Sequence, residues 1–158
     1  RARAPGPTLP GALDQMGNVR LGRGIEIRGG KSYEVWATKE ICPLFTTPVR
    51  VGGHLFGTSS GKPANPEGLM CFDPADGKVL WKVKAFEHGQ VLAIDGVVLA
   101  LDGQKGDLVM IEPTAEAFRE ITRFTPLGGR SWSTFFTVGD RLILRNQREL
   151  ACYKLGAD

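Results

Sequence analysis

Apolar residues in this chain occur in short runs of about five residues, most of which alternate with polar positions. Alternation with a period of two predicts half-buried β-strands, and no segment keeps the 3.6-residue period of a helix. Residues 114–120 are expected to form one helical turn at most. Glycine (21) and proline (10) suit tight turns between short strands. The expected strands are residues 24–28, 33–36, 47–51, 54–59, 69–73, 78–84, 90–94, 97–102, 107–112, 118–124, 133–138, 141–145 and 149–154.

The strands belong to a repeat. Trp36, Trp81 and Phe124 each lie near the end of a strand, at intervals of 45 and 43 residues. The turns at 51–55, 94–98 and 138–142 keep nearly the same spacing. A repeat of 40–50 residues that contains only strands is typical of a β-propeller. The fold class expected is therefore all-β, built from four-stranded antiparallel blades.

The strand count predicts an incomplete ring. We expect residues 1–17, which contain Pro5, Pro7 and Pro10, to form an extended arm or linker. Residues 18–158 then form a partial propeller of about three to four blades, at about 18–37, 45–84, 88–125 and 131–155. Only the two middle blades have four strands. Because propellers usually close with four to eight blades, the outer faces need a cover. A longer chain, a second copy or a different partner are the options.

Composition and charge exclude some classes of function. A net charge of +3 does not indicate nucleic-acid binding, and no apolar run approaches the roughly 20 residues of a transmembrane helix. The chain does not begin with methionine, as expected of a processed product or a piece of something longer. Cys42, Cys71 and Cys152 show no metal-ligand spacing. Cys71 and Cys152 occupy equivalent repeat positions, so we expect no disulfide between them, and buried, inert thiols throughout.

Residues 71–81 (CFDPADGKVLW) resemble the repeat signature of the PQQ-like, or quinoprotein-like, β-propellers. In that family a strand ends in Asp, a turn carries Gly and the next strand carries Trp, as Asp73, Gly77 and Trp81 do here. Asp accepts backbone N–H bonds, Gly permits a left-handed turn and Trp buries a flat face between blades. The match is partial around Trp36 and weaker around Phe124.

The resemblance implies the carboxy-terminal part of an exported repeat protein, in a periplasmic or secreted setting. The family contains alcohol and sugar dehydrogenases, which bind PQQ and Ca²⁺, and scaffolds, which only bind partners. The dehydrogenases imply adjacent cysteines, acidic and amide Ca²⁺ ligands and a catalytic Asp. This chain has no adjacent cysteines and no clustered ligand set. We therefore expect a scaffold without a cofactor.

Other catalytic patterns are missing from the sequence. His54 and His88 fall at different places in the repeat and have no partner at metal-ligand spacing. No Gly-x-Ser-x-Gly motif marks a serine hydrolase. Residues 102–106 (DGQKG) are rich in glycine but lie between strands, whereas a phosphate-binding loop precedes a helix. We therefore expect no catalytic, cofactor-binding or metal-binding residue.

Two segments are candidates for contact with a partner. Trp132, Phe135 and Phe136 form the densest aromatic group, for which packing between blades and a partner hot spot are both open. Lys62 and Asn65 belong to the longest loop of the complete blade. We expect a non-enzymatic structural or binding module that docks protein partners through strand edges, blade faces and rim loops. The alternatives are a fragment of a PQQ-dependent dehydrogenase and a half-propeller that closes by homo-oligomerisation.

Overall fold

The fold is all-β. A computed structural model describes residues 22–43, 45–59 and 68–156, among which it contains thirteen strands and no helix. The expected arm at 1–17 lies outside the described residues. The strands are β1 (Gly22–Arg28), β2 (Lys31–Thr38), β3 (Val49–Val51), β4 (His54–Ser59), β5 (Gly68–Phe72), β6 (Val79–Val83), β7 (Gln90–Ile94), β8 (Val97–Leu101), β9 (Leu108–Ile111), β10 (Glu120–Phe124), β11 (Phe136–Val138), β12 (Arg141–Arg145) and β13 (Leu150–Lys154).

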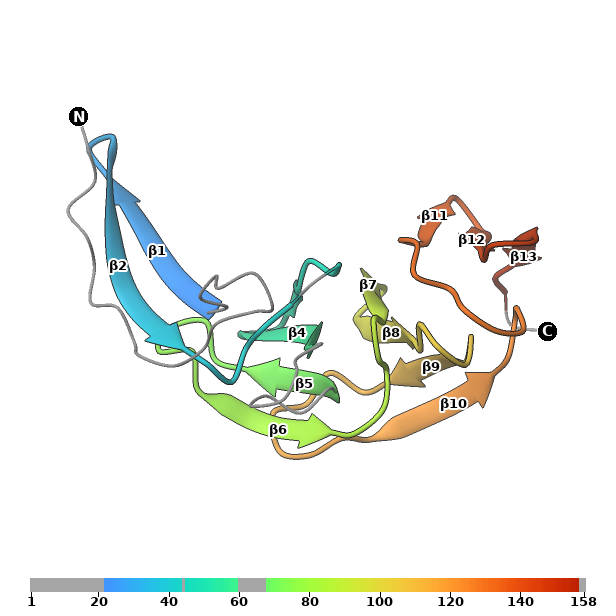
Figure 1. Cartoon of the computed structure of the whole chain (residues 1–158), viewed down its shortest axis with the longest axis horizontal. Helices are drawn as coiled ribbons and strands as arrows, with labels where there is room; N and C mark the ends of the chain where they lie inside the picture. The colour runs from blue at the N-terminus through green and yellow to red at the C-terminus, as the bar shows by residue number, and fades with distance from the viewer. Residues whose placement is uncertain (1–21, 44, 60–67, 157–158) are drawn as a thin grey trace.

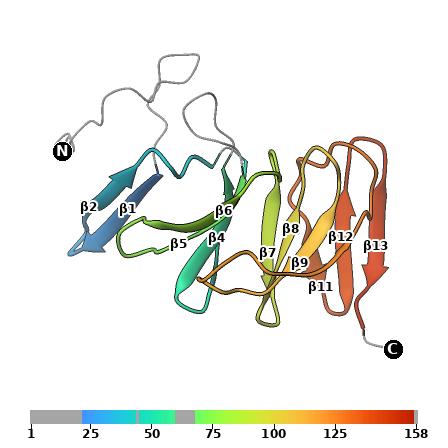
Figure 2. The same ribbon diagram turned by 90° about the horizontal axis from the view of Figure 1, so that it is seen from below.

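The strands form four antiparallel sheets, each a meander in chain order, which we call blades. Blade A is β1–β2, blade B is β3–β6, blade C is β7–β10 and blade D is β11–β13. The blades follow one another along an arc and do not close a ring (Figures 1 and 2). Strands β7 and β11 lie toward the concave side of the arc, whereas β6 and β10 lie on its convex side (Figure 1). The arrangement confirms the expected fold class of incomplete propeller-like blades.

The two outer blades lack different strands. Trp36 of β2 matches Trp81 of β6, so blade A contains the counterparts of the third and fourth strands of blade B. The turn Gly139–Asp140 of blade D matches the turn Asp95–Gly96 of blade C, so β11–β13 are a first, second and third strand. Among the described residues, blade A therefore has no first two strands and blade D has no fourth.

The expected strands all appear at the expected places. The bounds 54–59, 90–94 and 141–145 are as expected, and the others differ by one to three residues at an end. Residues 115–117 bend the chain and no helical turn forms there, within the expectation of one turn at most. There the N–H of Glu116 donates to Oγ1 of Thr114 (3.2 Å), a local bond that competes with helix formation.

Hydrophobic side chains fill the space between neighbouring blades. Met70 and Phe72 of β5 pack toward blade A with Trp36. Leu69 and Cys71 of the same strand pack with residues of blade C. A sheet that is buried on both faces needs apolar residues at every position, which is why all five residues of β5 are buried. The core is thus divided into layers between blades.

Two tryptophans join successive blades. Nε1 of Trp36 donates a hydrogen bond to the backbone oxygen of Pro74 in the next blade (2.9 Å). Nε1 of Trp81 does the same to Thr114 O (2.8 Å), and its ring packs on Phe118. Each tryptophan buries its ring and still satisfies its polar N–H. The 45-residue spacing of these residues thus marks a repeated joint.

The joint between blades C and D uses a different donor. Phe124 has no N–H group in its side chain, and its ring is still 44% exposed, although it contacts Tyr153 edge-on with 5.8 Å between ring centroids. The hydroxyl of Tyr153 donates to Pro126 O (2.8 Å). A residue of the following blade therefore supplies the hydrogen bond at this boundary. Phe124 covers the boundary only in part, because its ring remains exposed.

Gly77 provides the first test of this joint. Its φ of +73° is left-handed, and a Cβ there would lie 2.5 Å from the ring of Trp36. Gly96 has a similar φ of +78°, but a Cβ at that position would meet no atom within 4 Å. We expect Gly96→Ala to cost about 1–2 kcal/mol through backbone strain, and Gly77→Ala about 1–3 kcal/mol more through displacement of Trp36. Urea unfolding of both variants measures the difference in the free energy of unfolding. Equal losses would mean that the ring of Trp36 can move aside without cost.

Candidate functional site

One rim of the arc is built from two kinds of connection. Linkers that lead into the first strand of a blade meet turns between the second and third strands. The N–H of Ser131 donates to Gly103 O (2.9 Å), and the N–H of Phe86 donates to Oδ2 of Asp102 (3.1 Å). Oγ1 of Thr58 donates to Gly89 O (2.7 Å). These bonds join segments that are distant in the chain, so the rim is held in a defined shape.

Two buried polar residues organise the turns of this rim. Oδ1 of Asp102 accepts from the N–H groups of Gln104 (2.9 Å) and Lys105 (3.0 Å). Oδ1 of Asn146 accepts from the N–H groups of Arg148 (2.7 Å) and Glu149 (2.9 Å). Both residues follow the second strand of their blade and are 44 residues apart. The 44-residue spacing could have indicated that both residues hold a turn in the same way. Sequence reasoning proposed this role only for Asp73, whose Oδ1 accepts from the N–H of Ala75 (2.8 Å).

Three aromatic side chains cluster on the rim. The ring centroids of Phe45 and His88 lie 5.5 Å apart, those of His88 and Trp132 4.8 Å, and those of Phe45 and Trp132 6.2 Å, with planes within 30° of parallel. The residues are 43 and 44 positions apart, so each precedes the first strand of its blade. Sequence reasoning compared His88 only with His54, which lies at a different place in the repeat, and did not connect it with Phe45 or Trp132. Trp132 is 39% exposed and Phe45 is 56% exposed.

The side chain of Gln90 connects the two linkers that carry Phe45 and Trp132. Its side chain is buried at the start of β7, and Nε2 donates to the backbone oxygens of Phe45 (2.9 Å) and Trp132 (3.4 Å). One amide group of blade C thus bonds to the linkers of both neighbouring blades. Because buried carbonyl groups without donors cost free energy, this residue fixes the relative position of three blades.

The predicted contact residues lie in three different places. Trp132 belongs to the rim, and Phe136 is 49% exposed on the outer face of blade D. Phe135 is buried in the layer between blades C and D with Leu142 and Leu144, and so is not available to a partner. Neighbouring residues of an extended segment point to opposite sides, which explains the different fates of Phe135 and Phe136. Lys62 and Asn65 lie outside the described residues.

The outer face of blade D combines apolar side chains with basic ones, since the register also places Arg141, Arg145 and Lys154 on it. Phe136 pairs with Ile143, and Ile143 pairs with Cys152, so these side chains share a face with Val138 and Leu150. Phe136, Val138 and Leu150 are all exposed. Cys152 is exposed as well, which corrects the expectation that every thiol is buried. Its counterpart Cys71 is covered by blade C, whereas no described residue covers Cys152.

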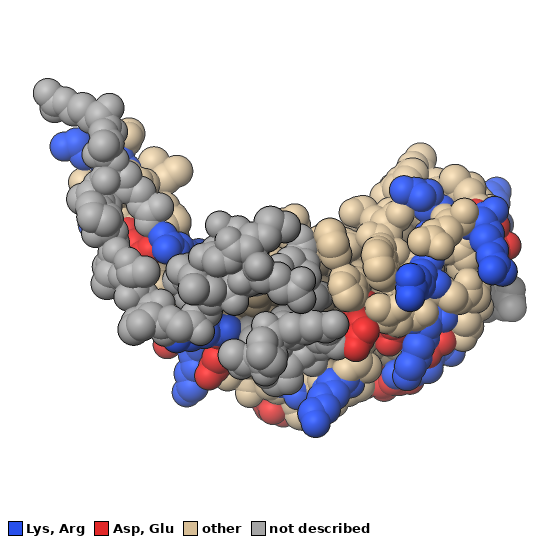
Figure 3. Space-filling model, in the orientation of Figure 1, with Lys and Arg blue, Asp and Glu red and all other residues tan. Residues whose placement is uncertain are grey.

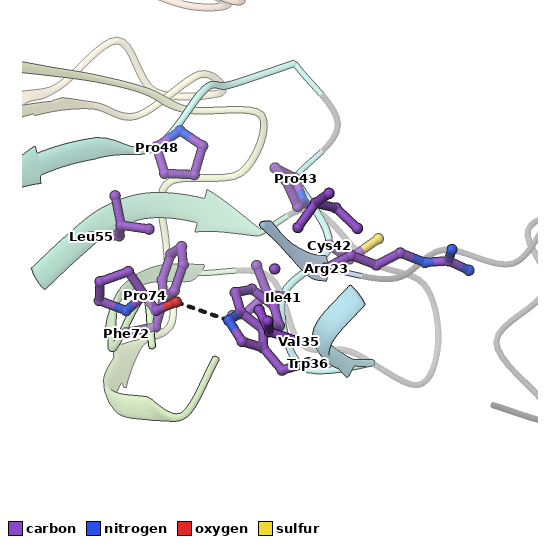
Figure 4. Close-up of a pocket in the computed structure, with 13 residues that line it drawn as sticks. Arg23, Val35, Trp36, Ile41, Cys42, Pro43, Pro48, Leu55, Phe72 and Pro74 are labelled. Carbon is purple, nitrogen blue, oxygen red and sulfur yellow. Dashed lines mark hydrogen bonds between the residues drawn. The ribbon is translucent and has the colours of Figure 1, made fainter. Parts of the chain in front are cut away.

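A groove separates blade A from blade B. It has a volume of about 580 Å³ and is lined by residues 22–25 of β1 together with Trp36, Pro48, Leu55 and Phe72, among others. Figure 4 shows the ring of Trp36, bonded to Pro74 O, facing Phe72 and Leu55 across this space. Pro48 and Leu55 come from the first half of blade B, so the groove lies beside the place of the two strands that blade A lacks.

Other kinds of site find no support among the described residues. They contain no group of three His, Cys, Asp or Glu side chains that could hold a metal ion, so the Ca²⁺ implied by the dehydrogenase interpretation has no such ligand group there. Nor do they contain a helix long and apolar enough to span a membrane. No model of a protein family matches the chain, and no curated protein matches it significantly. Function is therefore inferred from geometry.

The thiols provide a test of the exposed face. Burial, with the nearby Asp73 as the second cause, raises the pKa of Cys71 from 9.0 to about 11. Since the thiolate is the nucleophile, we expect Ellman's reagent at a pH of about 8 to modify Cys152 rapidly in dilute, unassociated chain, and Cys42 and Cys71 only after unfolding. The raised pKa leads to a second expectation. As the pH rises from 9.0 towards about 11, the free energy of unfolding should fall, because Cys71 ionises in the unfolded chain but not yet in the folded one. Modification of Cys71 in the folded chain would contradict this.

Gln90 provides a second test. Gln90→Leu keeps the volume of the side chain but leaves the carbonyl groups of Phe45 and Trp132 without their donor. We expect a loss of about 1–3 kcal/mol in the free energy of unfolding. Gln104→Leu is the matched control, because Gln104 lies in the turn after β8 and its side chain makes no hydrogen bond to the described residues. Chemical denaturation compares the two, and similar losses would exclude a specific role for the Gln90 amide.

Proposed function

We propose that this chain is a non-enzymatic binding module of the PQQ-like propeller type, which docks a protein partner through its two incomplete outer blades. The observation that carries the proposal is the unequal strand count of the four blades. Blades B and C have four strands each, whereas the described residues give blade A two and blade D three. The repeat thus specifies what the described residues lack, namely a first and second strand in blade A and a fourth strand in blade D.

The exposed residues support docking at both ends. In blade A, Ile25 and Ile27 on one face and Tyr33 and Val35 on the other are each about half exposed or more. The outer face of blade D adds Phe136, Val138 and Leu150. Exposed apolar patches beside unpaired strand edges are typical of protein-binding surfaces. Covering about 400 Å² of such a face contributes about 10 kcal/mol before ordering costs, at about 25 cal/mol per Å².

The groove beside β1 suggests what the partner presents. In blade B, β5 is paired along its whole length with residues 55–59 of β4, at the edge that corresponds to the edge of β1 with which no described strand pairs. An antiparallel strand added to β1 would repeat that pairing, and its apolar side chains would face Leu55 and Pro48 across the groove. The occupant that best fits is therefore an extended segment with alternating apolar residues.

The strand count favours a different polypeptide over a second copy. One copy's blade D offers a first, second and third strand, whereas another copy's blade A offers a third and a fourth. Joined, they would contain two third strands and five strands in all. The described parts of two copies therefore do not supply each other's missing strands, which weighs against closure of the ring by homo-oligomerisation.

Native mass spectrometry and sedimentation of the isolated chain test the proposal. We expect concentration-dependent, open-ended association, with protection of Cys152 from alkylation as association proceeds, because the outer faces bury themselves imperfectly on one another. Val138→Lys should reduce this association at least about tenfold, because it replaces an apolar contact residue by a positive charge beside Arg141. Ile121→Lys is the matched control, since Ile121 is similarly exposed but lies on the outer strand of a complete blade.

The possible outcomes separate the interpretations. A discrete species of twice the mass would favour the homo-oligomer instead. A monomer that stays soluble at about 100 μM with Cys152 fully reactive would overturn the proposal, because surfaces that need a partner should not remain uncovered without cost.

A further inference from the structure

We infer that a pocket on the rim of blade D binds an oxyanion, either a phosphate or a carboxylate group. The pocket has a volume of about 460 Å³ and is lined by Gly128, Gly129, Arg130, Asn146, Gln147 and Arg148. It lies between the linker that enters blade D and the turn between β12 and β13. The site is separate from the outer blade faces, so the inference does not depend on the docking proposed above.

The charge of the lining is unbalanced. Arg130 and Arg148 contribute two guanidinium groups, and no acidic residue lines the pocket. Five of the nine arginines in the described part of the chain form an ion pair with a carboxylate, as Arg123 does with Glu120 and Asp107. Neither Arg130 nor Arg148 forms such a pair with a described carboxylate. Two guanidinium groups that line one pocket without a counter-charge are suited to bidentate binding of an oxyanion.

The walls of the pocket are held in place before any ligand arrives. Nδ2 of Asn146 donates to Gly128 O (2.9 Å), while its Oδ1 accepts from the N–H of Arg148 (2.7 Å). This one side chain, which is 7% exposed, therefore links the two loops that form the pocket. Arg130 lies over the ring of Trp132, with its Cζ 5.4 Å from the ring centroid. Stacking of this kind limits the freedom of the guanidinium group and lowers the entropy cost of binding.

The two glycines keep the pocket open. A Cβ placed on Gly128 or Gly129 would meet no atom within 4 Å, so the space in front of this backbone is free. Gly129 has a φ of +83°, a left-handed conformation that other residues rarely adopt. A ligand can therefore approach the backbone of this loop closely, as oxyanions do where main-chain N–H groups are accessible.

The surrounding charge favours an anion as well. Residues 126–156 contain five Lys or Arg and two Asp or Glu, and basic side chains are frequent over this end of the molecule (Figure 3). One of the two acidic residues, Glu149, is close to the pocket, since its Oε1 lies 3.5 Å from Nδ2 of Asn146. Its carboxylate bonds to that amide and forms no ion pair with either pocket arginine, so both guanidinium groups remain available.

Titration of the ¹⁵N-labelled chain with inorganic phosphate and, separately, with acetate at constant ionic strength tests the inference. We expect saturable shifts of the Gly128 and Gly129 amide signals with one or both anions, and the tighter of the two identifies the preferred group. Arg130→Gln and Arg148→Gln should each weaken binding at least about fivefold. Arg145→Gln is the matched control, because Arg145 lies on β12 of the same blade, forms no ion pair with a described carboxylate and carries the same charge.

Two results would overturn the inference. Shifts that fail to saturate with either anion would mean that the pocket has no binding site. A loss of affinity in Arg145→Gln equal to that in the two pocket variants would mean that anion binding depends only on the net charge of blade D. Anion binding is measured directly, and Arg130 and Arg148 lie on the rim rather than on the outer blade faces, so neither result bears on the docking of a protein partner.

Discussion

The structure depends on the burial of sheet faces against one another. A single blade is a thin sheet with two apolar faces, and each face is removed from water only by the next blade along the chain. Met70 and Leu69 are adjacent in β5 yet belong to different layers of the core. No blade therefore has a core of its own, and stability accumulates across boundaries. The tryptophan joints, with one indole N–H bonded to the following blade, set the distance between neighbours.

The same constraint explains the ends of the arc. In the two blades that have a neighbour on each side, inner strands are buried on both faces, as in β5 and β8. Where none of the described residues provides a neighbour, similar kinds of residue are exposed. Cys71 and Cys152 occupy equivalent positions, but only the first is covered. Exposure at the ends thus reflects the missing neighbour rather than a different kind of sequence, and the strand count of each outer blade indicates which neighbour is missing.

On the rim, buried polar side chains connect the linkers and turns, which the apolar layers between the blades do not hold. Gln90, Asp102 and Asn146 are buried polar residues that hold linkers and turns by several hydrogen bonds each. Their bonds leave the outward surface of the rim to exposed aromatic and arginine side chains. In this way hydrogen-bonded linkers and turns present exposed side chains on the rim, and loops held by a rigid scaffold are where binding groups are often placed.

The sequence by itself determined the strands, the repeat and the incomplete outer blades, because alternation and turn residues act locally and the repeat copies them every 43 to 45 positions. It also located Trp36, Trp81, Asp73 and Gly77, whose roles are confined to adjacent blades. Only the tertiary structure decided that Phe135 is buried while Phe136 is exposed, that Cys152 is uncovered, and that Phe45, His88 and Trp132 meet. It alone brought Arg130 and Arg148 to one pocket. Those outcomes depend on contacts between segments that are distant in the chain, and no local pattern encodes them.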